Sequence, residues 1–339
     1  QHHETLRPAD PARARADALD VVRALRAAGH IAAFAGGCVR DELLGLAPTD
    51  FDVATDATPQ RVAALFPRTA EVGASFGVVL VHAPSSTIEV ATFRADGPYS
   101  DRRRPDHVHF SDPASDAARR DFTINALFLS PVLDAASESA APAEFERGTG
   151  LKPHVQPLAG PNGVLIGHVI DYVSGMADLH ARTLRAVGDP DQRLAEDHLR
   201  ALRAVRFSAR LDFPIEPATA DAIRRHAGEL RGVSRERIGD ELRKLLGHPS
   251  PAARARGLEL LHGLGLDAPV LAKPSPTTLP GAPALLAALP PLDYPASLAA
   301  WALAHLGATN PPEHPFGIRP GPDSLAARTL VARWRDALN

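Results

Sequence analysis

GGCVRDELLGLAPTDFD, at residues 36–52, is the stretch of sequence that decides the fold. The short apolar run Ile31–Phe34 leads into its two glycines, and Val39–Leu44 predicts one or two helical turns that end at Gly45. Glycines let backbone N–H groups approach a phosphate closely at a helix N-terminus, where the unpaired donors favour negative charge. The stretch therefore predicts a strand, a phosphate-binding turn and a helix, and Arg40 could add a charge-assisted hydrogen bond.

The end of the same stretch carries two carboxylates. Asp50 and Asp52 alternate with apolar residues, which is the period of a half-buried strand, so we expect both side chains on one face. Such a pair can share one or two Mg²⁺ ions, which would activate an attacking hydroxyl and stabilise a leaving pyrophosphate. Either half alone could be an ordinary turn or an exposed strand edge. Together they favour a nucleotide site, and the absence of a GxxxxGK[ST] sequence argues against an ordinary P-loop.

Length and composition set the class of protein. The chain has 339 residues, 45% of them hydrophobic and 23% charged, which suits about two globular domains. We expect a soluble, cytoplasmic protein, because no apolar run approaches the roughly 18 residues of a membrane span and the first residues do not resemble a secretory signal. The single cysteine, Cys38, excludes an intrachain disulfide and a multi-cysteine zinc site.

The predicted elements change character along the chain. Up to about residue 128, predicted helices (14–28, 58–66) alternate with predicted strands (50–53, 76–82, 87–93). Between 131 and 170 the pattern dissolves into Ala, Ser, Pro and Gly, which predicts a surface insertion. After residue 178 nearly every segment predicts a helix, including 195–211, 218–230 and 234–246.

Charge is distributed unevenly. The formal net charge of the whole chain is -3, yet residues 181–256 contain fifteen Arg and one Lys against eleven Asp and Glu, a net charge of +5. A local positive surface can attract phosphates even when the rest of the molecule repels them. The helical half is therefore a candidate surface for a nucleic acid.

Two further polar segments could contact a nucleotide. In RRDFTINA, residues 119–126, Arg120 could reach a phosphate, and Asp121 and Asn125, about one helical turn apart, could hold a ribose hydroxyl. The alternative is a helix start whose Asp favours the dipole and whose arginines are solvated.

In EDHLRALRAVR, residues 196–206, Asp197 and Arg200 are spaced as helical neighbours. An acceptor beside a donor can imitate a Watson–Crick edge and would select CTP and ATP, since uracil and guanine present a carbonyl to the carboxylate. The alternative is an ion pair within one helix, beside a solvated basic face that includes Arg203 and Arg206.

The four motifs, in this order, resemble those of class II tRNA nucleotidyltransferases and bacterial poly(A) polymerases, over about residues 20–265. The resemblance implies an α+β fold, in which an N-terminal polymerase-beta-like nucleotidyltransferase head with a mixed sheet precedes an all-helical neck, body and short tail. It places the head at 14–175 with an insertion at about 131–170, the neck at 176–248, and a proline-rich body and tail at 249–339. Asp171–Leu179 resembles the hinge motif between head and neck, and Ser234–Leu246 the helical motif that ends the conserved part.

The resemblance also implies roles for individual residues. Asp50 and Asp52 would bind Mg²⁺, with Glu89 as a third catalytic carboxylate or, alternatively, an exposed residue of the 87–93 strand. The nucleotide would contact Gly36, Gly37, Arg40, Arg120, Asp121, Asn125, Asp197, Arg200, Arg203 and Arg206.

The implied activity is template-independent addition of CMP and AMP to the tRNA 3′ end, with CTP and ATP as substrates and neither a membrane nor an obligate protein partner involved. Residues 76–94 resemble tRNA nucleotidyltransferases more than poly(A) polymerases, and YSDRRRPDHV, residues 99–108, resembles the loop that enzymes adding only CC lack. The alternatives are a poly(A) polymerase, an A-adding partner of a split system, a non-catalytic RNA-binding relic, and an enzyme that nucleotidylates a small molecule.

Overall fold

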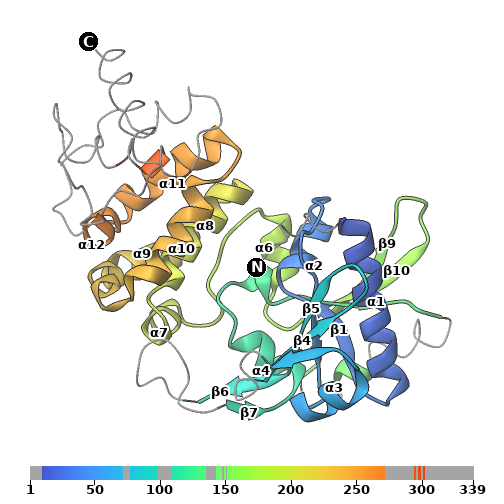
Figure 1. Cartoon of the computed structure of the whole chain (residues 1–339). Helices are drawn as coiled ribbons and strands as arrows, with labels where there is room; N and C mark the ends of the chain where they lie inside the picture. The colour runs from blue at the N-terminus through green and yellow to red at the C-terminus, as the bar shows by residue number, and fades with distance from the viewer. Residues whose placement is uncertain are drawn as a thin grey trace, which may run out of the picture. The chain divides into compact units, whose positions relative to one another are not determined.

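The computed structural model describes residues 10–71, 77–97, 108–134, 143–146, 149, 151–271, 294, 297–298 and 301. The chain divides into two compact units (Figure 1). The first comprises the described residues of Gln1–Ala181 and Arg185–Asp189, and the second those of Arg182–Leu184 and Pro190–Asn339. Within the described part of the chain, no helix combines the length and the apolar character needed to cross a membrane.

The first unit is built on a mixed sheet of eight strands among the described residues, in the order β3-β4-β5-β2-β1-β8-β10-β9. All neighbouring pairs are antiparallel except β2 with β5, which is parallel. The strands are β1 (Ala32–Ala35), β2 (Asp52–Thr55), β3 (Thr69–Glu71), β4 (Val78–His82), β5 (Thr87–Thr92), β8 (Phe128–Pro131), β9 (His154–Ala159) and β10 (Leu165–Asp171). A separate ribbon pairs β6 (Arg94–Asp96) with β7 (Val108–Phe110).

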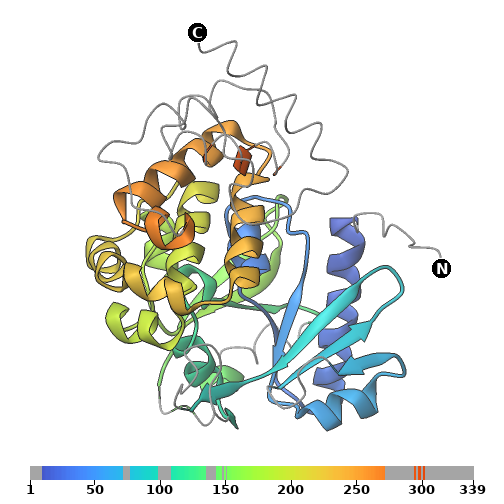
Figure 2. The same ribbon diagram turned by 60° about the vertical axis from the view of Figure 1, so that its left-hand side comes forward.

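Helices cover this sheet, as the predicted α+β fold requires. They are α1 (Pro11–Ala27), α2 (Gly37–Leu43), α3 (Pro59–Leu65), α4 (Pro113–Ala118) and α6 (Gly175–His180), with the short 3-10 helix η2 (Thr123–Asn125). Asp10 caps α1, and the buried side chains of Ala18, Val22 and Leu25 recur at helical spacing along it. This stripe places α1 along the sheet, against β1, β2 and β5 (Figure 2).

Aromatic side chains fill the core on the other side of the sheet. Phe93, Phe128 and Phe145 are each fully buried, with ring centroids 5.7 Å apart for Phe93 and Phe128 and 6.2 Å apart for Phe128 and Phe145. Alanines of β1 and β2, such as Ala33 and Ala54, belong to the same cluster. Their small side chains leave room for the rings, and the core supports the sheet end that carries the glycine turn.

The expectation of an irregular insertion over 131–170 is wrong for its second half. Residues 154–159 and 165–171 form β9 and β10, and β10 pairs with both β8 and β9. Gly160 and Gly163 close the hairpin, in which the Gly160 N–H donates to the Val164 carbonyl at 2.8 Å. The residues on both sides of this turn pair as strands, because pairing satisfies their backbone groups.

The described part of the second unit is helical, as predicted. Its elements are α7 (Pro190–Glu196), α8 (Arg200–Leu211), α9 (Pro217–His226), η3 (Ala227–Gly232), α10 (Arg235–Leu246), α11 (Pro251–Gly263) and α12 (Asp267–Leu271). Leu202, Val205, Leu242 and Leu258 are among the buried side chains where α8 packs against α10 and α11. The helix expected over 195–211 is interrupted at residues 197–199.

Candidate functional site

The glycine turn brings two of the predicted motifs together. Gly36 follows β1 with φ 75° and ψ -124°, and its N–H donates to the Leu127 carbonyl at 3.0 Å. A Cβ atom at this position would lie 2.8 Å from Nη1 of Arg120. The backbone conformation therefore favours glycine here, and any side chain would also have to displace the guanidinium packed against the turn. Gly37 then begins α2, two residues before the predicted start at Val39.

Arg120 lies over the core at this turn. Its Nη1 donates to the Asn125 carbonyl at 3.1 Å, and its guanidinium carbon lies 5.3 Å from the centroid of the Phe128 ring. About one fifth of its side chain is exposed. The charge is thus held beside the backbone amides of the turn, where a phosphate would need it.

The acidic residues occupy the start of β2 and the neighbouring strand. Asp52 is the first residue of β2 and is directly opposite Glu89 in the parallel register with β5. Asp50 lies outside the strand, is exposed, and accepts a hydrogen bond from the Thr49 hydroxyl at 3.2 Å. The prediction of one strand containing both aspartates is wrong, because the strand begins only at Asp52, where pairing with β5 begins.

The pKa of Asp52 responds to these neighbours. Burial raises it, the carboxylates of Glu89 and Asp50 raise it further, and the charge of Arg120 opposes them, which together place it at about 6. Clustered carboxylates that repel one another are a donor set that a hard divalent cation would stabilise. Residues of this kind therefore fit a metal. Within the described residues, however, no group of three or more His, Cys, Asp or Glu side chains is arranged to hold one, so the role of Glu89 stays a prediction.

The remaining predicted residues of the first unit form a buried network. The guanidinium of Arg40 donates to the Asp41 carboxylate at 2.7 Å and 2.9 Å, and to the side-chain oxygen of Asn125. The Asn125 amide in turn donates to Asp121 at 3.1 Å. Arg40 is only 2% exposed. The network links α2 to η2 and fixes both against the glycine turn, so any phosphate contact by Arg40 stays a prediction.

The segment that resembles the hinge motif is built on two aspartates that sequence reasoning did not single out. Asp171 accepts from the backbone N–H groups of Gly175 and Met176 at 3.0 Å and 2.9 Å and so begins α6. Asp178 accepts from the Thr123 hydroxyl at 2.7 Å and from Arg185 Nε at 3.1 Å. These contacts join η2 to residues 185–189 of the same unit. The sequence signal was the DYVSGMADL segment itself, in which both acids lie.

In the second unit, Asp197 and Arg200 lie at the break between α7 and α8. The Asp197 carboxylate accepts from the Leu199 N–H at 3.1 Å and from Arg237 Nη2 at 2.6 Å. Arg200 donates to the Arg193 carbonyl at 2.6 Å and to Glu196. The prediction that both belong to one continuous helix is wrong, because Asp197 folds back onto its own turn and ends the helical run there.

Helix α10 supplies the partners of the basic face of α8. Glu241, which is 4% exposed, lies 2.6 Å from Arg206 and 4.0 Å from Arg203. Arg206 also lies over the Phe207 ring at 4.1 Å. Arg237 and Glu241 are one helical turn apart on α10. Arg237 pairs with Asp197, between α7 and α8, and Glu241 pairs with Arg206 of α8. The sequence reasoning missed both, although their i, i+4 spacing within Ser234–Leu246 was the available signal.

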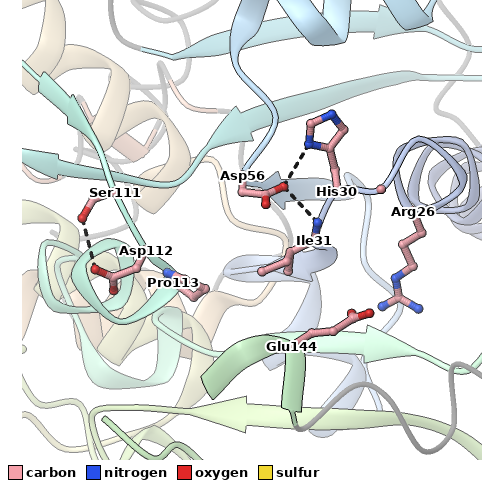
Figure 3. Close-up of a pocket in the computed structure, with 9 residues that line it drawn as sticks. Arg26, His30, Ile31, Asp56, Ser111, Asp112, Pro113 and Glu144 are labelled. Atoms are coloured by element: carbon pink, nitrogen blue, oxygen red, sulfur yellow. Dashed lines mark hydrogen bonds and ion pairs between the residues drawn. The ribbon is translucent and has the colours of Figure 1, made fainter. Parts of the chain in front are cut away.

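Two features lie outside this arrangement. The loop expected at 99–108 lies outside the described residues except for Val108, which begins β7. A cavity of about 570 Å³ is present at the other end of β1 (Figure 3). Ile31 and Asp56 line it, whereas the glycine turn follows the opposite end of that strand. The residues predicted for nucleotide and metal are not among those that line this cavity.

Two family models match the chain. Residues 32–139 match the poly A polymerase head domain, and residues 212–275 match the probable RNA and SrmB-binding site of polymerase A. The first match includes the glycine turn, the acidic residues and the 119–126 segment, and the second includes α10.

Individual proteins agree with these models. The chain is 40% identical over 230 residues to the CCA-adding enzyme of Lacticaseibacillus paracasei, covering 68% of this chain and 49% of that protein. It is 38% identical over 253 residues to the CCA-adding enzyme of Geobacillus stearothermophilus, covering 74% and 54%. The chain thus spans about half the length of these curated relatives.

A solved structure aligns with a larger share of the chain than these sequences do. The crystal structure of the Bacillus stearothermophilus CCA-adding enzyme in complex with CTP aligns with a TM-score of 0.71 and 30% identity. The alignment covers 95% of this chain and 70% of that one.

Proposed function

Because the chain belongs to the family of CCA-adding enzymes, which are tRNA nucleotidyltransferases, we propose that it adds CMP and AMP to the 3′ end of tRNA without a template. The 3′ hydroxyl attacks the α-phosphate of CTP or ATP, the bond to the β-phosphate breaks, and pyrophosphate leaves. The observation that carries the proposal is the packing of Arg120 on the Gly36 turn, in the same unit as the acidic residues of β2 and β5.

In this proposal the first unit binds the triphosphate and the attacking hydroxyl. The amides after Gly36 and the guanidinium of Arg120 neutralise the phosphates. Asp50 and Asp52 would hold Mg²⁺, which when bound lowers the pKa of the hydroxyl and offsets charge on the departing pyrophosphate. The raised pKa of Asp52 is consistent with this role, since such a carboxylate gains most from a cation. No covalent intermediate on the protein is needed.

The second unit would select the base. Asp197 accepts from the exocyclic amino group of cytosine or adenine, and Arg200 donates to the neighbouring ring nitrogen. Arg237 and Glu196, which contact these two residues, hold both side chains in position before the base arrives. The basic face of the same unit would attract the phosphates of tRNA.

The test is incorporation into tRNA that lacks its 3′ end, with CTP alone, with ATP alone and with all four triphosphates. We expect C with CTP alone and CCA with the full set. A long A tail without C would instead identify a poly(A) polymerase, and a single A without C an A-adding enzyme. Nucleotide binding with no incorporation would support the non-catalytic alternative.

A matched pair of variants tests the acidic residues within the same assay. Asp52→Asn should abolish incorporation while leaving nucleotide binding largely intact. Asp56→Asn is the control, because Asp56 follows the other end of β2, where its carboxylate accepts from the Ile31 N–H and contacts His30. Undiminished turnover by Asp52→Asn would remove the metal assignment.

A further inference from the structure

We propose that Asp116 is a positioning residue for nucleotide binding, which acts by aiming the guanidinium of Arg120 at the Gly36 turn. The inference rests on the proposed function, because it assumes that Arg120 contacts the nucleotide phosphates. It adds a residue of α4 that belongs to none of the motifs from which the function was argued.

The pairing between these two side chains is two-pronged. Arg120 Nε and Nη2 donate to the same oxygen of Asp116, Oδ2, at 3.2 Å and 3.0 Å. Its third nitrogen, Nη1, is thereby turned toward the Asn125 carbonyl and the Gly36 backbone. A guanidinium held through two nitrogens has little rotational freedom left, so the direction of the third is set by the carboxylate.

Asp116 is buried to a degree that only a paired carboxylate tolerates. Its side chain is 1% exposed, and its other oxygen, Oδ1, accepts from Arg119 Nε at 2.9 Å. Burial alone would raise the pKa of Asp116, but the guanidinium groups of Arg120 and Arg119 hold it below its ordinary value. Asp116 therefore remains charged at neutral pH and stays paired with Arg120.

The aimed guanidinium reaches both halves of the proposed site. A Cβ at Gly36 would touch its Nη1, which places the charge against the turn that would bind the phosphates. Its field also lowers the pKa of Asp52 against the effect of burial. A rotation of Arg120 away from Asp116 would change the charge at the Gly36 turn and at Asp52. The Asp116 carboxylate of α4 therefore controls the phosphate contact of Arg120 without touching the phosphates itself.

The experiment is a double-mutant cycle on CTP affinity, with Asp116→Asn, Arg120→Ala and the combined variant, each measured by equilibrium binding and by urea unfolding. We expect Asp116→Asn to weaken CTP binding by about tenfold or more. In the Arg120→Ala background, the same change should have no further effect on affinity. Equal losses in both backgrounds, or no loss in either, would overturn the inference.

Two controls separate aiming from mere support of α4. Asp112 caps the same helix through the Ser115 N–H at 2.9 Å, so Asp112→Ala should lower stability without weakening CTP binding. Arg119→Ala removes the second guanidinium that pairs with Asp116, whose Oδ1 also accepts from the Arg94 N–H at 3.4 Å, and should also leave affinity unchanged. If either control loses as much affinity as Asp116→Asn, the carboxylate has a structural role only.

A second variant keeps the test decisive if Asp116→Asn does not fold. Arg120→Lys retains the charge but cannot make the two-pronged contact. We expect its CTP affinity to fall close to that of Arg120→Ala, and wild-type affinity would refute the inference. Failure of the wild-type protein to bind either CTP or ATP would instead refute the proposed function, and the two failures are therefore distinguishable.

Discussion

Replacement of Gly36 by alanine tests the geometry on which the proposed site depends. The backbone at Gly36 has φ 75° and ψ -124°, a conformation that costs a residue with a side chain about 1–3 kcal/mol. The new methyl group would also lie 2.8 Å from Arg120 Nη1, so the guanidinium must move. We therefore expect a loss of stability of about 1–3 kcal/mol from the backbone, together with a loss of CTP affinity from the displaced charge.

The control is Gly45→Ala. Gly45 also has a positive φ, 69°, but a Cβ there would meet nothing within 4 Å. It should therefore lose about 1–2 kcal/mol of stability without any change in nucleotide affinity. Urea unfolding gives the first quantity and equilibrium binding of CTP the second.

The two components of the Gly36 effect can be separated. In an Arg120→Ala background there is no guanidinium to displace, so the added methyl group should cost only the backbone term and should not change affinity further. The reasoning fails if Gly36→Ala unfolds at the wild-type urea concentration and binds CTP as the wild type does. It also fails if the loss of affinity persists undiminished without Arg120.

Three further outcomes follow from contacts in the two units. Arg237→Ala removes the partner 2.6 Å from Asp197, and we expect misincorporation of UMP or GMP to rise; an unchanged base preference would show that Arg237 does not orient that carboxylate. Gly175→Ala should destabilise the protein by more than 1 kcal/mol, since its methyl group would collide with the Thr123 carbonyl, whereas Gly232→Ala, with nothing within 4 Å, should not. The pKa of Asp116 is lower in the folded protein than its ordinary value of 3.8, so the ionised carboxylate stabilises the fold above that pH. Stability should therefore fall as the pH drops below about 4 and Asp116 is protonated, and in Asp116→Asn this part of the acid dependence should disappear.

Local patterns were enough to predict the elements around the glycine turn. The apolar run before Gly36 became β1, and α2 ends at Leu43, within one residue of the predicted end. Such features depend on neighbours in sequence, namely glycine conformations and helical spacing. The pairing of Asp52 with Glu89 could not be read in this way, because it is set by a parallel register between strands that are 37 residues apart.

The hairpin of β9 and β10 could not be predicted for a different reason, namely the composition of the sequence around it. Asn162-Gly163 followed by the apolar run Val164–Ile166 is a hairpin signal, but the abundance of Ala, Ser, Pro and Gly over the preceding thirty residues concealed it. Strand β9 also contains Pro157, which suits an edge strand and weakens the pattern. The average composition of residues 131–170 therefore predicts one irregular segment, although its second half forms two strands.

Residue spacing within a single helix could not predict the ion pairs between helices of the second unit. Spacing alone suggested that Asp197 pairs with Arg200 within a helix, whereas the structure pairs Asp197 with Arg237, forty residues later. The signal for the break at 197–199 is weak, since an aspartate can either continue a helix or bond to its own turn. Tertiary packing of α10 against α8 decides between the two.

The parallel register of β2 and β5 limits how this protein can be recombined with its homologues. The loop joining β4 to β5 is tethered by Asp17, which accepts from the Ser85 N–H at 2.9 Å and the Ser86 hydroxyl at 2.8 Å. A chimera that exchanges the β4–β5 hairpin must keep the number of residues at its two junctions, so that β5 stays in register with β2. One extra residue after Thr87 would turn Glu89 to the opposite face and put the apolar Ile88 beside Asp52, which converts a pair of acids into an acid next to a hydrocarbon.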